Sequence, residues 1–96
     1  MRNVRQRNSF KQDLKRETKG KHRKIFDKGG IFDQVLWKLM NDEPLPSLYR
    51  DHALHNNLEG MRECHLRPNL LLIYSYEGDD WLILERLGSH SEILGL

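Results

Sequence analysis

Three histidines and one arginine are the residues of this sequence whose types and order suggest chemistry. His65 belongs to the segment RECHLRPNLLLIY, residues 62–74, which predicts a strand, a Pro-Asn corner and a second, more apolar strand. His52 precedes this segment in YRDHAL, and Arg86 and His90 follow it in ERLGSHSEIL. We expect one small sheet to gather the three imidazoles around the guanidinium.

A metal site is one interpretation of the histidines, because three imidazole nitrogens can bind a catalytic zinc ion. The sequence contains no HExxH or Cys-x-x-Cys spacing. Cys64 and His65 are neighbours on the expected strand, so their side chains should point to opposite faces. We therefore expect neither a metal ion nor another cofactor.

Acid–base catalysis without a metal is the second interpretation. Cleavage of RNA through its own 2′-hydroxyl needs a base for that hydroxyl, an acid for the departing 5′-oxygen and cations for the phosphorane. Imidazole can be the acid or the base because its ordinary pKa is close to neutrality. The planar fork of arginine matches phosphate oxygens in pairs. His22 and His55 are interpreted as ordinary surface histidines.

The charge of the chain is unevenly distributed along its 96 residues. Residues 1–28 contain eleven Lys/Arg and three Asp/Glu, a net charge of +8, whereas residues 29–96 contain five and eleven, a net charge of −6. A basic N-terminal segment is suited to binding phosphates, although a solvated helix face would have the same composition. The candidate RNA-binding residues there are Lys11, Lys15, Arg16 and Lys19.

Helical patterns dominate the first half of the chain. Ser9 is a candidate N-cap for a helix that includes Phe10 and Leu14, and a short edge strand can precede it. A break is expected at Gly29-Gly30. Residues 31–41 then form the clearest helix, with Ile31, Phe32, Val35, Leu36, Leu39 and Met40 in one apolar stripe.

Alternating patterns dominate the second half. On the first strand Met61, Glu63, His65 and Arg67 share one face, and Arg62, Cys64 and Leu66 share the other. LLLIYSY predicts a central strand covered on both faces, and WLILERL predicts a third strand. Ser89-His90-Ser91-Glu92 is a capping box that should start a short helix, in which the positive helix end favours a neutral His90. We predict one α+β domain, residues 1–96, with two N-terminal helices packed on a small, mainly antiparallel sheet.

The order of these motifs resembles a known family. PLPSLYRDHALHNNLEGMRECHLRPNLLLIY followed by LERLGSHSEIL is similar to the YafQ group of RelE-superfamily toxins from bacterial type II toxin–antitoxin systems. The resemblance covers roughly residues 44–94. It implies a RelE-like fold and a ribosome-dependent endoribonuclease that cuts messenger RNA in the decoding site. It also implies inhibition by a cognate antitoxin of the DinJ or RelB type.

The resemblance also implies roles for particular residues. His52, His65, Arg86 and His90 occupy the positions that the family uses for catalysis, with Arg86 on phosphate. His90 is expected to transfer one proton and His65 or His52 the other, and which is the base stays open. Asn69 is a further candidate, and Arg67 and Leu94 are candidates for contact with RNA.

Two positions depart from the family pattern. Asn69 replaces an aspartate and cannot accept a proton, and Leu94 replaces an aromatic residue that could stack on a base. The alternative to a fully active nuclease is therefore an attenuated module that binds the ribosome, RNA and antitoxin, and acts as a co-repressor. The lone Cys64, the absence of a long apolar run and the absence of an apolar N-terminal core predict a cytoplasmic chain without a membrane partner.

Overall fold

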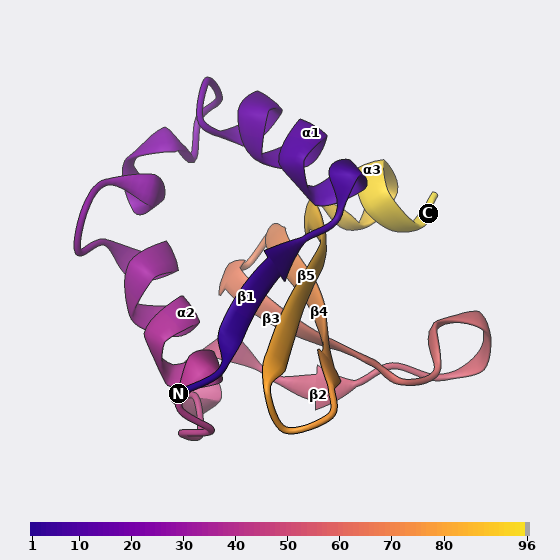
Figure 1. The fold of residues 1–96 in the computed structure, drawn as a ribbon. Coiled ribbons are helices and arrows are strands. Elements are labelled where there is room, and N and C mark those ends of the chain that lie inside the picture. The colour runs from indigo at the N-terminus through magenta and orange to yellow at the C-terminus, as the bar shows by residue number, and fades with distance from the viewer. Residues whose placement is uncertain (96) are drawn as a thin grey trace.

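The computed structural model describes residues 1–95, except for the side chain of Leu94. These residues form a sheet of five strands in the order β1-β5-β4-β3-β2 (Figure 1). β1 is parallel to β5, and the other neighbouring strands are antiparallel. The bounds are β1 (Asn3–Gln6), β2 (His52–Ala53), β3 (Met61–Arg67), β4 (Leu70–Glu77) and β5 (Trp81–Gly88). The predicted α+β fold with a mainly antiparallel sheet is confirmed.

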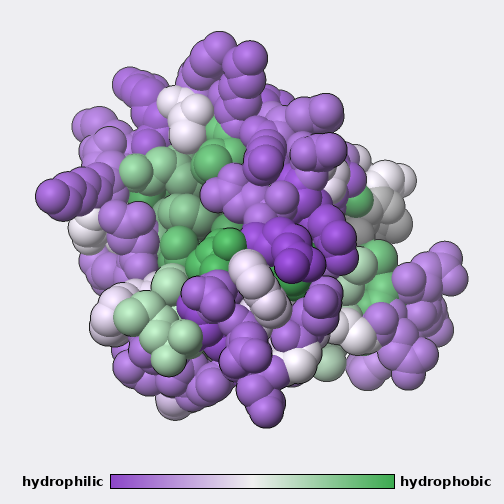
Figure 2. Space-filling view, in the orientation of Figure 1, coloured by the Kyte–Doolittle hydropathy of each residue, from purple (hydrophilic) through white to green (hydrophobic). Residues whose placement is uncertain are grey.

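Two helices form an arc over one face of this sheet. α1 (Asn8–Glu17) and α2 (Ile31–Met40) are joined through the 3-10 turn η1 (Arg23–Phe26) (Figure 1). In α2 Val35 and Leu39, one turn apart, are buried, as the predicted stripe requires. Figure 2 shows apolar side chains gathered inside the arc and surrounded by hydrophilic ones. The buried core between the helices and the sheet consists of Phe10, Ile25, Val35, Leu39, Cys64, Leu66, Leu70, Leu72, Tyr74, Leu82, Leu84 and Leu87.

The start of α1 differs from the prediction. The N-cap residue is Arg7, and its side chain makes no capping hydrogen bond. Ser9 lies within the first turn, where its hydroxyl donates to the backbone carbonyl of Glu85 at 2.9 Å. The prediction of Ser9 as N-cap is therefore wrong, because this hydroxyl joins α1 to β5 instead of closing its own helix. The break at Gly29-Gly30 is confirmed, since Gly29 has a φ of 77° and a Cβ on Gly30 would lie 2.8 Å from the carbonyl oxygen of Ile25.

The opposite face of the sheet has a second, smaller cover. Leu71, Ile73 and Ile93 form a buried cluster there, and Leu54 and Met61 pack against it. Ile93 comes from α3 (His90–Leu94), which follows β5 directly. β4 is thus covered on both faces, as its continuous apolar sequence predicts. The loop that contains η3 (Asn56–Leu58) projects away from the body between β2 and β3 (Figure 1).

No helix formed by residues 1–95 is both long enough and apolar enough to span a bilayer.

Candidate active site

The carboxylate of Glu63 lies among three imidazoles on the face of the sheet opposite α1 and α2. Its Oε2 is 3.3 Å from Nε2 of His52 and 3.5 Å from Nε2 of His65. Its Oε1 is 3.6 Å from Nε2 of His90. The ring centroids are 6.4 Å apart for His52 and His65, and 6.0 Å apart for His65 and His90. We call these four residues the histidine cluster.

The histidine cluster is buried at its base and open to solvent at its rim. The side chains of Glu63 and His65 are 4% and 9% exposed, whereas those of His52 and His90 are 49% and 44% exposed. Oε1 of Glu63 is buried without a hydrogen-bond partner among the described residues. A buried carboxylate oxygen without a partner destabilises a fold, and such costs are tolerated mainly at functional sites.

Glu63 is absent from the residues that were predicted to form the site. The signal was present in the sequence, because the two-residue period that places His65 on this face places Glu63 there as well. A glutamate on a partly buried strand face needs a charged or hydrogen-bonding neighbour. That requirement, applied to Glu63, would have indicated a partner such as His65.

His52 is positioned by the loop before it as well as by β2. It pairs in register with Glu63. Its Nδ1 lies 2.6 Å from the carbonyl oxygen of Arg50, and because a carbonyl can only accept, Nδ1 carries the hydrogen. Nε2 is then the atom of His52 that exchanges a proton. Arg50 itself is in the left-handed region, with φ 50° and ψ 41°, a conformation that costs a non-glycine residue about 1 kcal/mol.

Asp51 anchors this loop to the sheet. Its carboxylate accepts hydrogen bonds from the hydroxyl of Tyr74 and from Nη2 of Arg62, the latter at 3.1 Å. Nε of Arg62 also donates to the Tyr74 hydroxyl at 3.3 Å. Burial, followed by the hydrogen bond to Asp51, raises the pKa of Tyr74 well above its ordinary value, so the hydroxyl remains a donor. The Asp51 and Arg62 of the sequence motifs therefore hold His52 in place.

We expect Tyr74→Phe to loosen the loop that carries His52. The variant loses one buried hydrogen bond and leaves Asp51 partly unsatisfied, which should lower the free energy of unfolding by about 1–2 kcal/mol. Amide hydrogen exchange at residues 52–54 should become faster. The matched control is Tyr76→Phe, which removes a hydroxyl bonded to the carbonyl of Leu39 at 3.3 Å and not to Asp51. Equal exchange in the two variants would show that the Tyr74 hydroxyl does not hold the loop through Asp51.

His90 is the first residue of α3, and the predicted capping box is present. The Ser89 hydroxyl accepts from the backbone N–H of Glu92 at 3.2 Å, and the Glu92 carboxylate accepts from the backbone N–H of Ser89 at 3.0 Å. Gly88 permits the abrupt change from β5 to α3. Its φ is 155°, and a Cβ there would lie 3.0 Å from Ile93 and 2.7 Å from Nη2 of Arg16.

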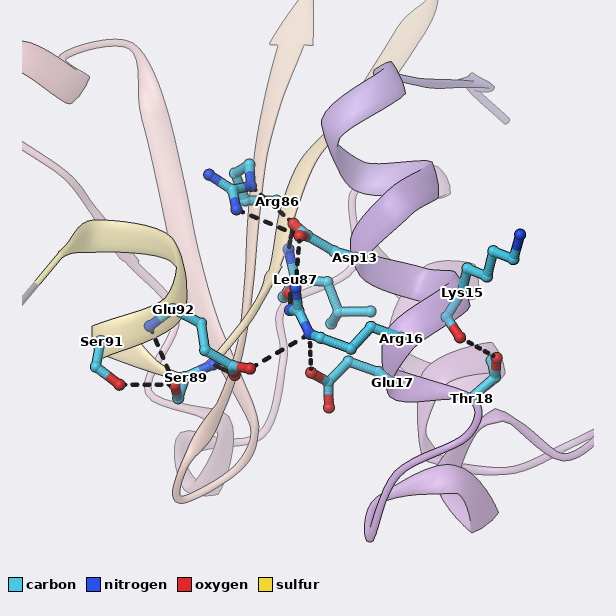
Figure 3. Close-up of polar contacts among 10 residues, drawn as sticks. All are labelled: Asp13, Lys15, Arg16, Glu17, Thr18, Arg86, Leu87, Ser89, Ser91 and Glu92. Atoms are coloured by element: carbon cyan, nitrogen blue, oxygen red, sulfur yellow. Dashed lines mark hydrogen bonds and ion pairs between the residues drawn. The ribbon is translucent and has the colours of Figure 1, made fainter.

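Arg86 lies on the same face of the sheet as Glu63. Ile73 is the register partner of both residues, so the three form a row across β3, β4 and β5. The Arg86 guanidinium is bound to Asp13 of α1, with Nε 2.7 Å and Nη2 3.3 Å from the two carboxylate oxygens (Figure 3). The hydrogen bond to Asp13 raises the pKa of Arg86 above its ordinary value. Arg86 therefore remains a cation on the rim of this face.

The other predicted residues lie outside the histidine cluster. Asn69 is exposed in the turn between β3 and β4, where it shares a cavity of about 390 Å³ with Ser89, Ser91 and Lys21. Arg67 lines another cavity of about 390 Å³ together with His65. The predicted role of Leu94 concerns a side chain outside the described residues.

The predicted basic residues of α1 differ among themselves. Lys11, Lys15 and Lys19 are exposed. Arg16 is instead bound to carboxylates of Asp13, Glu17 and Glu92 at 3.0–3.3 Å, and to the carbonyl of Leu87 at 2.8 Å. Its guanidinium joins α1 to β5 and α3, so we expect it to contribute less to phosphate binding than the lysines.

Comparison with known proteins gives these residues a family context. The sequence model of a family described as "Bacterial toxin of type II toxin-antitoxin system, YafQ" matches residues 2–95. The chain belongs to this YafQ toxin family. The resemblance predicted from the histidine and arginine motifs is thereby confirmed, and it extends through the helical half of the chain.

Individual relatives in the YafQ family agree with this assignment. A putative toxin YafQ of Haemophilus influenzae is 44% identical over 67 residues, 67% of this chain and 66% of the relative. The mRNA interferase toxin YafQ of Escherichia coli K12 is 40% identical over 55 residues, 57% of this chain and 59% of the relative. The matched sequence thus spans somewhat more than half the length of the E. coli relative.

Solved structures match over nearly the whole chain. A copper-bound mutant toxin from Helicobacter pylori has a TM-score of 0.84 and 36% identity, with 97% of this chain and 99% of that chain covered. The YafQ chain of the E. coli DinJ–YafQ complex has a TM-score of 0.80 and 30% identity, with 99% and 100% covered. The fold is therefore that of the YafQ and RelE-like toxins.

Proposed function

We propose that this chain is a ribosome-dependent endoribonuclease toxin that cleaves translated mRNA. The observation that carries the proposal is the histidine cluster, in which two solvent-facing imidazoles and one buried imidazole share one carboxylate. The E. coli relatives are named mRNA interferase toxins, and an enzyme of that class needs groups that move protons at a phosphodiester. Membership of the YafQ family supports the same activity.

The proposed reaction transfers two protons at one phosphodiester. One imidazole takes the proton from the 2′-hydroxyl, and the 2′-oxygen forms a bond to phosphorus. The bond from phosphorus to the 5′-oxygen breaks, and a second imidazole donates a proton to that oxygen. The products are a 2′,3′-cyclic phosphate and a free 5′-hydroxyl. Arg86 stabilises the charge on the phosphorane, as a preorganised cation does in phosphoryl chemistry.

The buried Glu63 carboxylate has two roles in the proposed reaction. It lies 3.3–3.6 Å from all three Nε2 atoms, where it can accept a hydrogen bond from an Nε2–H, and it balances one positive charge when an imidazole has accepted a proton. The assignment of base and acid stays open between the two solvent-facing residues His52 and His90 and the buried His65. Effective positioning accounts for a large part of such catalysis, and the ribosome would supply it for the RNA.

Mapping of mRNA 5′ ends in a purified translation system tests the proposal. We expect cuts within the coding sequence that require ribosomes, and their positions would show any codon preference. No cuts under conditions in which the chain binds ribosomes would contradict a nuclease function. That outcome would favour the attenuated binding module, for which the uncharged Asn69 is the supporting residue. Asn69→Asp should then restore cleavage.

The proposed partners follow from charge and from the family. The lysines of α1 and the N-terminal net charge of +8 suit ribosomal RNA around the decoding site. An antitoxin of the DinJ type is proposed because the E. coli YafQ toxin has been solved in complex with DinJ. Both partners would be met in the cytoplasm.

Two toxin structures from H. pylori that resemble this chain contain bound metal, which is copper in the mutant toxin. Imidazole nitrogens and a carboxylate oxygen are donors that copper and zinc accept. In residues 1–95, however, no group of three such side chains is arranged to hold an ion. The proposed reaction therefore assigns proton transfer to the imidazoles and charge stabilisation to Arg86.

Removal of metal from the toxin is expected to leave cleavage unchanged. The chain would be dialysed against EDTA and exchanged into fresh buffer before ribosomes are added, so that the ribosomes keep their Mg²⁺. The rate of mRNA cleavage should stay within about twofold of the untreated rate, because proton transfer by imidazoles needs no Lewis acid. Loss of cleavage with recovery on addition of Zn²⁺ or Cu²⁺ would establish a metal-dependent nuclease.

A further inference from the structure

α1 lies beside the C-terminal part of β5, along the edge where β1 no longer pairs with it. β1 pairs with β5 only from Trp81 to Leu84, and beyond that point the edge of β5 faces α1. Asp13 occupies this position, 3% exposed, and accepts a hydrogen bond from the backbone N–H of Leu87 at 2.9 Å. The carboxylate of Asp13 thus satisfies a backbone N–H on a strand edge that no further strand covers.

The same carboxylate holds the side chain of Arg86. Its two oxygens accept from Nε and Nη2 of Arg86, and Oδ1 also accepts from Nη1 of Arg16 at 3.1 Å (Figure 3). Burial alone would raise the pKa of Asp13, but the hydrogen bonds from Arg86 and Leu87 and the two guanidinium charges lower it overall. Asp13 is therefore an ionised, fully hydrogen-bonded group.

The geometry leaves one edge of the Arg86 guanidinium free. A guanidinium has two edges that can bind an anion through paired hydrogen bonds, one formed by Nε and Nη2 and one by Nη1 and Nη2. Asp13 occupies the first edge. Nη1 makes no hydrogen bond within residues 1–95, and the Arg86 side chain is 34% exposed. A phosphate on the sheet face can then be bound through the second edge.

We propose that Asp13 is a positioning residue that fixes Arg86 so that its free edge meets the phosphate at which the histidine cluster acts. This inference rests on the proposed nuclease function and adds a residue to it. A long arginine side chain loses rotamer freedom when it binds a ligand, and a partner that fixes it beforehand removes this cost from the transition state. Asp13 is 73 residues from Arg86 in the sequence and lies outside the motifs that contain the histidines and Arg86.

A double-mutant cycle tests whether Asp13 acts through Arg86. Single-turnover cleavage of ribosome-bound mRNA would be measured over a range of toxin concentrations for Asp13→Asn, Arg86→Gln and the double variant. Asp13→Asn keeps the size of the side chain but removes its charge and one acceptor. We expect its maximal rate to fall about 10–100-fold with the half-saturating concentration within about threefold, because positioning of Arg86 matters in the transition state.

Non-additivity is the result that a purely structural role would not produce. Asp13→Asn should slow the Arg86→Gln variant by less than about twofold, since the group it positions is already absent. The control is Ser9→Ala, which removes another hydrogen bond from α1 to β5 and should keep the wild-type rate. A wild-type rate in Asp13→Asn, or an equal slowing in both backgrounds, would overturn the proposal.

Two further measurements keep the test decisive. If Asp13→Asn does not fold, Arg86→Lys is measured instead. The lysine ammonium, when bound to Asp13, has no second planar edge for a phosphate. The cleavage rate of Arg86→Lys should therefore fall as far as that of Arg86→Gln. A near-wild-type rate in Arg86→Lys would overturn the proposal. Nitrogen-15 NMR of the free protein should show slow exchange of the Arg86 Nε–H in wild type and fast exchange in Asp13→Asn. If the wild-type chain cuts no mRNA, the proposed function fails, and slow or fast exchange still decides whether Asp13 holds Arg86.

Discussion

We expect His90→Ala to reduce cleavage of ribosome-bound mRNA by about 10²–10⁴-fold, the usual contribution of a proton-transferring side chain. The His90 imidazole is 3.6 Å from Glu63 and is nearly half exposed, so it combines access to substrate with a carboxylate that balances its charge. The fold should be little affected, because Ser89 and Glu92 form the capping box of α3 independently of the imidazole. Ribosome and antitoxin binding should therefore persist.

His55→Ala is the matched control for this experiment. His55 is an exposed histidine in the loop between β2 and β3 and belongs to neither the histidine cluster nor the basic helix. The His55→Ala variant should cleave mRNA at the wild-type rate. If His90→Ala also cleaves normally while His52→Ala or His65→Ala does not, His90 is not a proton-transfer partner. Normal cleavage in all three variants would contradict the whole histidine cluster as the active site.

We expect Glu63→Gln to change activity and stability in opposite directions. Cleavage should fall about 100-fold or more, because the imidazoles lose the charge that orients them and balances an added proton. The free energy of unfolding at pH 8 should rise by about 1 kcal/mol. The reason is that Glu63 is a buried carboxylate whose Oε1 has no hydrogen-bond partner within residues 1–95. Urea unfolding and the single-turnover rate would be measured on the same preparations.

Glu85→Gln separates this effect from the general loss of a strand carboxylate. Glu85 lies on β5, and its carboxylate is well bonded, at 2.8 Å from the Ser75 hydroxyl and 3.3 Å from Nε of Arg7. We expect its variant to be slightly less stable and fully active. A loss of stability in Glu63→Gln would show that the carboxylate stabilises the fold through the imidazoles around it, and that the site is not a source of strain.

Local patterns in the sequence determined a large part of this structure. The alternation on β3 placed Met61 and His65 on one face, and the stripe on α2 placed Val35 and Leu39 in the core. The capping box located the start of α3 at Ser89. Each of these features depends on residues within one or two turns or on one strand, where the period of the backbone decides which side chains share a face.

Local chemistry also misled in one place. Ser9 has the residue type and position of an N-cap, yet its hydroxyl bonds to Glu85, 76 residues away in the sequence. A hydroxyl at the start of a helix can hydrogen-bond to its own helix or to a neighbouring strand, and the partner depends on which strand lies beside it. Periodicity contains no information about that neighbour.

The identity of the candidate catalytic residues was readable from the sequence, whereas their connections were decided by the tertiary structure. Histidine, arginine and their motifs have recognisable chemistry, so His52, His65, Arg86 and His90 could be named without coordinates. The central place of Glu63 and the pairing of Asp13 with Arg86 depend on the strand order β1-β5-β4-β3-β2 and on α1 taking the place of a strand beside β5. The physical reason is the distance along the sequence over which each effect acts. Backbone geometry relates residues that are a few positions apart. Burial of apolar surface decides which distant segments pack together, and so which charged side chains need partners where those segments meet.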